Sequence, residues 1–347
     1  MRAHVLGALV LLCALAGATL VVVRARDDGA ASRAATSDPP TTTTAAFAAG
    51  TVPTTVPTTV TSTTAPPPPP TTATTVPPGP DIVAFSGLGA WIDVYDWSDA
   101  FNDTNTARIT TADIDRMADH GVQTLYVQSS KSEAPTDILE PERLLPLIAR
   151  AKLRHLTVVA WYLPSLENHA LDLQRLLAVA RLTGVDAVAV DIESQKVADV
   201  AERNRRLLEL TSGLRSALPR MAIGAIVYPP VVTDVLNPML WPNFPWRELA
   251  PSYDVWLPMN YQSFRKADSG YREGYRYTAE NVDRVRAHLG SSTVPVHVIG
   301  GIADETTAGD VAGMLRAAVE RRALGGSLYD YRTTPEALWA SLRPFRR

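Results

Sequence analysis

Between residues 81 and 347, short apolar runs alternate eight times with amphipathic stretches. The runs are largely apolar on both faces, as the strands of a covered parallel sheet are. Strands that alternate with helices form parallel sheets, and eight such units in a segment of this length favour a closed (β/α)8 barrel, the TIM barrel. We expect its strands at 89–95, 122–128, 156–162, 185–191, 221–228, 255–259, 296–299 and 326–329.

The stretches between these runs have helical signals. Thr111 fits a helix N-cap and Gly121 a helix end, and Pro141 stands where a helix begins. An open dinucleotide-binding sheet would need Gly-x-Gly-x-x-Gly after the first strand, and that pattern is absent, as is the P-loop. The predicted helices lie at 111–121, 141–152, 171–182, 197–218, 281–289, 307–324 and 335–342.

The N-terminal segment predicts export. An apolar run at 5–23 is long enough to cross a bilayer, so residues 1–26 form a signal peptide or an uncleaved signal anchor helix. Residues 27–80 are rich in Thr, Pro and Ala, which is typical of a disordered extracellular linker. We expect a single-pass protein of the cell membrane with residues 81–347 extracytoplasmic, or a secreted protein if the signal is cleaved.

Charge and composition exclude several classes of function. Residues 81–347 carry 29 Lys and Arg against 33 Asp and Glu, so we expect no nucleic acid partner. The only cysteine, Cys13, lies in the apolar run, and the six histidines lack metal-ligand spacing. The sequence therefore predicts neither a cofactor nor a metal site, and a metal site made mostly of carboxylates stays open as the alternative.

The fourth predicted strand ends in two acids, Asp191 and Glu193. Residues two apart on a strand share a face, so both carboxylates point the same way. The carboxyl ends of barrel strands are where active sites lie, and two carboxylates are the usual groups for hydrolysing a glycosidic bond. The alternative is that these acids cap the following helix.

Polar and aromatic residues also gather at the other predicted strand ends. Aromatic rings pack on the apolar faces of sugars, while amides and acids bind hydroxyls. This set therefore predicts a glycan site, with substrate contacts from Trp91, Asp93, Gln128, Trp161, Tyr228, Asn260, Gln262 and Asp330.

Two motifs resemble family 18 glycoside hydrolases, the chitinase-like barrels. Asp186-Ala-Val-Ala-Val-Asp191-Ile-Glu193 is similar to their Asp-x-x-Asp-x-Asp-x-Glu strand, and Met259-Asn-Tyr261-Gln262 to their Met-x-Tyr-Asp/Asn motif. The resemblance implies that Glu193 is the general acid. It implies also that Asp191 helps to hold a substrate N-acetyl group for attack on its own sugar, and that Tyr261 bonds this acetamide.

The chain departs from that pattern at three places. Ala189 replaces the middle acid, Gln262 follows Tyr261, and the expected Trp of the eighth strand is missing. Trp91-Ile-Asp93, together with the Asp-x-Glu pair, has a weaker similarity to family 25 lysozymes, which cleave peptidoglycan.

We therefore expect a glycoside hydrolase acting on a cell-envelope or extracellular polysaccharide, such as a peptidoglycan-type glycan. The first alternative is a non-catalytic glycan-binding protein on the same barrel. The second is a structural envelope protein that binds other proteins through the apolar loop 231–246.

Overall fold

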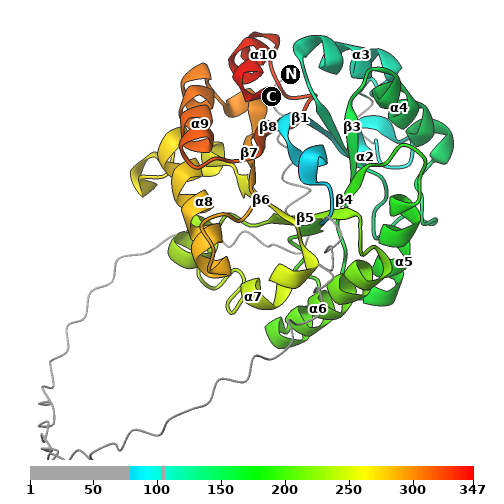
Figure 1. The fold of residues 1–347 in the computed structure, drawn as a ribbon, viewed down its shortest axis with the longest axis horizontal. Coiled ribbons are helices and arrows are strands. Elements are labelled where there is room, and N and C mark those ends of the chain that lie inside the picture. The colour runs from blue at the N-terminus through cyan, green and yellow to red at the C-terminus, as the bar shows by residue number, and fades with distance from the viewer. Residues whose placement is uncertain (1–78, 103–105) are drawn as a thin grey trace, which may run out of the picture. The chain divides into compact units, whose positions relative to one another are not determined.

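The computed structural model describes residues 79–102 and 106–347 and is shown in Figure 1. Eight parallel strands close into a barrel in sequence order, which confirms the predicted (β/α)8 architecture. The predicted anchor helix lies outside the described residues, as does the linker up to residue 78. The strands are β1 (Gly87–Ile92), β2 (Thr124–Gln128), β3 (Thr157–Tyr162), β4 (Ala187–Ile192), β5 (Ala222–Val227), β6 (Val255–Asn260), β7 (His297–Gly301) and β8 (Gly325–Tyr329).

Alternate residues of each strand enter two different cores. Trp91, Tyr126 and Ala189 belong to a cluster that fills the barrel interior. Their strand neighbours, such as Leu125 and Val188, belong to the larger cluster between the sheet and the helices. Both faces are thus buried, which explains why the strands read as apolar runs.

Helices cover the outside of the barrel (Figure 1). Local sequence sets their ends: Thr307 and Asp310 form a capping box at the start of one helix, and Gly121, with φ of 92°, ends another. The helices are α2 (Val94–Trp97), α3 (Thr111–His120), α4 (Pro141–Leu153), α5 (His169–Ala180), α6 (Val200–Ala217), α7 (Trp246–Leu249), α8 (Gly274–Leu289), α9 (Ala308–Glu320) and α10 (Glu336–Leu342).

The predicted end of the first strand and the predicted start of the helix at 281 are both wrong, because in each case a carboxylate side chain caps the start of a helix that the sequence did not predict there. The first strand ends at Ile92 rather than at residue 95, because Asp93 and Asp96 form a capping box that starts α2. Helix α8 begins at Gly274 rather than at residue 281, because the Glu273 carboxylate accepts from the first backbone amides of the helix.

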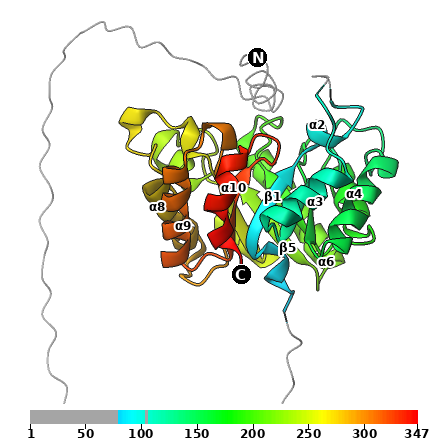
Figure 2. The ribbon, with the colours of Figure 1, turned by 90° about the horizontal axis from the view of Figure 1, so that it is seen from above.

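The two ends of the barrel differ, and Figure 2 shows them from the side. At one end, here called the mouth, lie the carboxyl ends of the strands, α2 and the segment that follows β6. At the other end, here called the floor, lie the short helix η1 (Ile82–Phe85) and the C-terminus. Within residues 79–102 and 106–347, no helix combines the length and apolar character that a membrane span requires.

Candidate active site

The two predicted catalytic acids stand at the mouth, at the end of β4. Asp191 lies in the strand and Glu193 follows it, and both share the inward parity of Ala187 and Ala189. They do not cap the next helix, because the side chain of Asp199 caps α6. The cap alternative is therefore excluded for this pair.

Burial gives both acids an unusual affinity for protons. It raises the pKa of Glu193 to about 7. Burial, and then the negative charge of Glu193, raise the pKa of Asp191 well above its usual value. Near neutral pH Glu193 is therefore partly protonated, and a carboxyl that is protonated there can act as a general acid.

The backbone beside Glu193 is held on two sides. The Tyr228 hydroxyl, from the end of β5, donates to the Glu193 carbonyl at 2.9 Å. The Ser194 hydroxyl donates to the Ser165 carbonyl at 3.0 Å. Tyr228, expected to contact substrate, thus holds the peptide that carries the acid.

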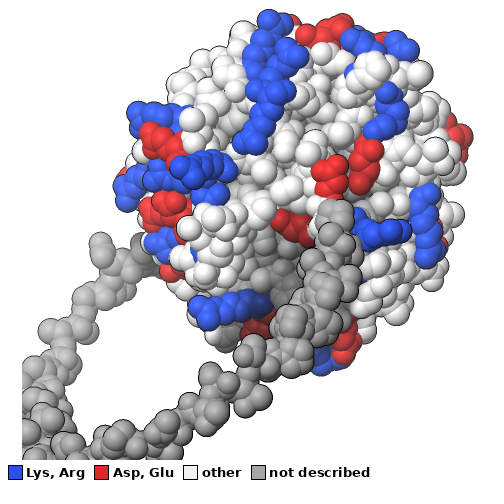
Figure 3. Space-filling view, viewed as in Figure 1, with Lys and Arg blue, Asp and Glu red and all other residues white. Residues whose placement is uncertain are grey.

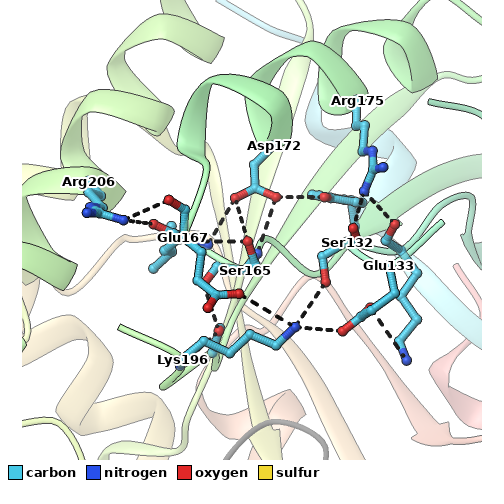
Figure 4. A network of polar contacts seen from close by, with 12 residues as sticks. Ser132, Glu133, Ser165, Glu167, Asp172, Arg175, Lys196 and Arg206 are labelled. Carbon is cyan, nitrogen blue, oxygen red and sulfur yellow. Dashed lines mark hydrogen bonds and ion pairs between the residues drawn. The ribbon is translucent and has the colours of Figure 1, made fainter. Parts of the chain in front are cut away.

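A polar network ties together the loops that follow β2, β3 and β4 (Figure 4). Lys196 reaches across from the β4 loop to Glu133 on the β2 loop, with Nζ 2.6 Å from Oε1. Asp172 accepts from the Tyr162 hydroxyl at 2.7 Å and from the Leu166 amide at 2.9 Å. This network limits the freedom of the loop that begins at Glu193.

Three buried polar atoms on neighbouring strands lack partners among the described residues. They are Asp191 Oδ1, the Trp161 indole nitrogen and the Ser130 hydroxyl. Trp161 and Asp191 are inward-facing, and Ser130 follows the end of β2 at the same parity as Gln128. Buried polar groups are normally hydrogen-bonded, so this set marks a place where a ligand would complete the bonding.

Aromatic rings line the mouth from strand to strand. The ring of Trp91 lies 6.0 Å from that of Trp161 and 6.4 Å from that of Tyr329. Tyr261 follows, 6.0 Å from Tyr329, and then Phe264 at 6.1 Å from Tyr261. The structure thus brings three predicted site aromatics, Trp91, Trp161 and Tyr261, into one line with Tyr329.

A second acidic group lies where β8 meets β1. Carboxylate oxygens of Asp93, Asp96 and Asp330 lie within 4.8 Å of one another. Burial raises the pKa of Asp93 to about 7, helped by Asp96, and raises that of Asp330 well above its usual value. The Tyr329 hydroxyl donates to Asp93 at 2.7 Å, and Arg332 Nε lies 2.7 Å from Asp96.

These three carboxylates are the metal-ligand set that the described residues offer. Each already has protein partners, since the Thr333 amide and hydroxyl both bond Asp330. The group therefore reads as an internally bonded network that joins β1 to β8.

The three amide residues predicted to contact substrate, Gln128, Gln262 and Asn260, bond or face other parts of the protein. Gln128 accepts from the Val94 amide at 3.1 Å, and Gln262 donates to the Thr306 hydroxyl at 3.4 Å, so both support loops. Asn260 is fully buried and shares the outward parity of Trp256, which packs with the helices. No partner for its amide is found in the described part of the chain. A substrate role for these three stays a prediction.

Two residues outside the predicted contacts also belong to the site, Tyr329 and Ser130. A parity rule finds them: Tyr329 lies two residues after the inward-facing Ser327, and Ser130 two residues after Gln128. Arg332 gave no such signal, because it lies beyond the strand.

Comparison with known proteins supports the fold. No protein-family model and no curated protein matches the sequence. Solved glycoside hydrolases of similar fold include a chitinase from Chromobacterium violaceum (12% identity, TM-score 0.51, covering 75% of this chain and 98% of that one). A family 18 chitinase from Cycas revoluta in complex with (GlcNAc)3 has 12% identity and a TM-score of 0.55 over 75% of this chain and 99% of that one.

The spore cortex-lytic enzyme SleL of Bacillus cereus is also similar, at 9% identity and a TM-score of 0.56, covering 76% of this chain and 74% of that one. The expected resemblance to family 18 barrels is thus confirmed for the fold. At these identities the likeness concerns architecture, and chemistry has to be argued from the site itself.

Proposed function

We propose that the protein is a glycoside hydrolase that cleaves a cell-envelope or extracellular polysaccharide. The observation that carries this proposal is the pair Asp191 and Glu193, inward-facing at the mouth of the barrel, with both pKa values raised. The aromatic line beside them, from Trp161 to Tyr261, suits sugar rings.

In the proposed reaction, Glu193 donates its proton to the glycosidic oxygen as the bond from that oxygen to the anomeric carbon breaks. The N-acetyl oxygen of the same sugar attacks that carbon, with Asp191 bonding the acetamide N–H and Tyr261 the acetamide oxygen. Glu193 then takes a proton from water, which opens the cyclic intermediate. The complex of the Cycas revoluta enzyme with (GlcNAc)3 supports a substrate with N-acetyl groups.

The test is reducing-end release from cell-wall glycans and chitin oligomers by the wild type and by Glu193→Gln. We expect kcat to fall at least about 100-fold, because general acid catalysis contributes 10²–10⁴. Glu305→Gln is the matched control, since Glu305 is an exposed acid beyond the end of β7. Equal activity of wild type and Glu193→Gln would remove Glu193 from the mechanism.

A non-catalytic glycan-binding protein is the second candidate. It is favoured by Ala189, which places a buried methyl group in the barrel interior where the family pattern has an acid. This candidate predicts saturable glycan binding without any change in oligosaccharide length over a long incubation. Product release by the wild type alone would exclude it.

We further propose that the barrel works outside the cytoplasm, held to the membrane by residues 1–26. The apolar run at 5–23 and the Thr/Pro-rich linker at 27–80 support this location. Protease added to intact cells should remove the barrel from the membrane fraction. A mature N-terminus after Ala16, where Ala14-Leu-Ala16 resembles a signal-peptidase site, would instead show a secreted protein.

A further inference from the structure

Residues 261–276, here called the β6 shelf, follow β6 at the mouth of the barrel and are drawn in yellow in Figure 2. The β6 shelf differs in charge from the rest of the barrel domain. It has fewer acids than bases, whereas the domain as a whole has more acids than bases. Its two acids are Asp268 and Glu273. Its four cations are Arg265, Lys266, Arg272 and Arg276.

None of these four cations has an ion-pair partner among the described residues. Ion pairs are common elsewhere on the surface; Arg205, for example, pairs with Glu202 at 2.7 Å and with Glu209 at 2.5 Å. The Glu273 carboxylate is occupied, because it accepts from the Tyr275 and Arg276 amides at the start of α8. The β6 shelf is therefore a local positive surface on an acidic domain.

Three of the four guanidinium or ammonium groups have defined positions, which is what a binding site requires. Arg272 Nη1 donates to the Gln262 carbonyl at 3.3 Å. The Arg276 guanidinium lies over the Tyr271 ring at 4.7 Å, and that of Arg265 lies 5.9 Å from the Tyr277 ring. The Nε of Arg265 is buried and has no partner in the part of the chain that the structure describes.

An aromatic ring lies beside these cations. Phe264 immediately precedes Arg265, and 41% of its surface is exposed. Its ring is 6.1 Å from that of Tyr261, at the outer end of the aromatic line that leads to Trp161. An exposed aromatic ring continuous with a lined mouth is a platform for a sugar unit next to the cleavage centre.

We infer that the β6 shelf binds carboxylate-bearing units of the glycan, so that the substrate is an acidic glycan rather than a neutral one. This inference rests on the proposed function and names its substrate class. Phe264 supports the sugar ring, and the neighbouring cations bond the carboxylates through charge-assisted hydrogen bonds. Because the rest of the domain is net negative, these cations offset the repulsion that an anionic polymer meets there.

The experiment uses three substrates and two variants. The substrates are carboxylate-bearing peptidoglycan glycan strands, the same strands with their carboxylates amidated, and neutral chitin oligomers. The test variant is Lys266→Gln/Arg272→Gln, which removes two exposed cations of the β6 shelf. The matched control is Arg220→Gln/Arg343→Gln, which removes two exposed cations from segments at the floor.

We expect the test variant to lose about 10-fold in kcat/KM on the carboxylated strands, which corresponds to roughly 1.4 kcal/mol. Its rates on the amidated strands and on chitin should equal those of the wild type, and the control should equal the wild type throughout. The wild type should also lose its preference for carboxylated strands as salt is raised, because exposed charges are screened.

Two failures are distinguishable. A wild type that cleaves amidated and carboxylated strands equally well, or a test variant that loses activity equally on all three substrates, overturns the β6 shelf inference and leaves the hydrolase intact. A wild type that cleaves none of the three overturns the proposed function. Binding of the same strands then decides the inference, because equal affinity for carboxylated and amidated forms contradicts it.

Discussion

Inward-facing residues line both the mouth and the floor of the barrel, but Asp191 and Trp161 at the mouth differ from His297 at the floor in how their polar atoms are bonded. On the floor side, both ring nitrogens of His297 are bonded, to the Phe85 carbonyl and to the Ser327 hydroxyl, each at 2.9 Å. The same Ser327 hydroxyl also accepts from the indole nitrogen of Trp91, whose ring belongs to the aromatic line of the mouth, at 2.7 Å. At the mouth, Asp191 and Trp161 carry buried polar atoms without partners in the described residues.

The difference indicates that His297 contributes to the stability of the barrel, whereas the polar atoms of Asp191 and Trp161 are available to a ligand. Satisfied polar groups complete a core, whereas buried unsatisfied ones reduce stability unless a ligand bonds them. The exterior of the floor agrees with a structural role, since Figure 3 shows Lys, Arg, Asp and Glu scattered over that face in both signs. The unpartnered atoms of Asp191 and Trp161 at the mouth are therefore the ones that the proposed glycan would bond.

The two ends also predict opposite dependences of stability on pH. Burial lowers the pKa of His297 to about 4, so below its unfolded value of 6.5 the unfolded chain binds the proton and stability falls. Burial raises the pKa of Glu193 from 4.5 to about 7, so between these values the folded chain binds more protons and stability falls as pH rises.

The largest expected effect is a loss of stability on replacing His297 at the floor. His297→Leu should lower the free energy of unfolding by about 3 kcal/mol at pH 8, because the Phe85 carbonyl and the Ser327 hydroxyl each lose a bond in a buried site. At pH 5 the difference should shrink to about 1 kcal/mol, since there the wild type already loses stability through His297. Urea unfolding at both pH values measures this. A difference that is equal at pH 5 and 8 would contradict the floor assignment.

The second effect has the opposite sign and lies at the mouth. Glu193→Gln should stabilise the protein by about 2 kcal/mol above pH 7, because it removes a carboxylate that is charged there against the cost of burial. At pH 4.5 the two proteins should unfold together. Thermal unfolding should show a rise of a few degrees at pH 8. Glu305→Gln, at an exposed position, should show no change, and a destabilised Glu193→Gln would refute the predicted sign.

The sequence predicted the placement of the site residues better at the end of β4 than at the end of β1. Asp191 and Glu193 continue an apolar strand in register, so parity alone placed them. Asp93 was assigned to a strand, but it caps α2 and contacts Tyr329, a residue 236 positions away. Pairings across the closure of the barrel, like that of Arg332 with Asp96, depend on three-dimensional proximity that no local pattern encodes.

The smallest effect compares two buried tryptophans of the barrel interior, Trp91 at 1% and Trp161 at 2% exposure. Trp91→Phe removes a donor that bonds Ser327, and it should cost about 2 kcal/mol through the lost bond and lost packing. Trp161→Phe loses similar packing but removes an N–H without a partner in the described residues, so it should cost about 1 kcal/mol less than Trp91→Phe.

Glycan binding should reverse this order. If the Trp161 N–H is a ligand donor, Trp161→Phe weakens glycan binding about 5- to 10-fold, as expected for one hydrogen bond. Trp91→Phe should leave binding nearly unchanged, because it keeps an aromatic ring in the line and removes an N–H that Ser327 already accepts. Titration calorimetry with the two variants and unfolding of the same samples measure both orders. If one of the two variants were both the less stable protein and the weaker binder, the effects on stability and on binding would not be assigned to different tryptophans. The unpartnered Trp161 indole would then not be a ligand donor.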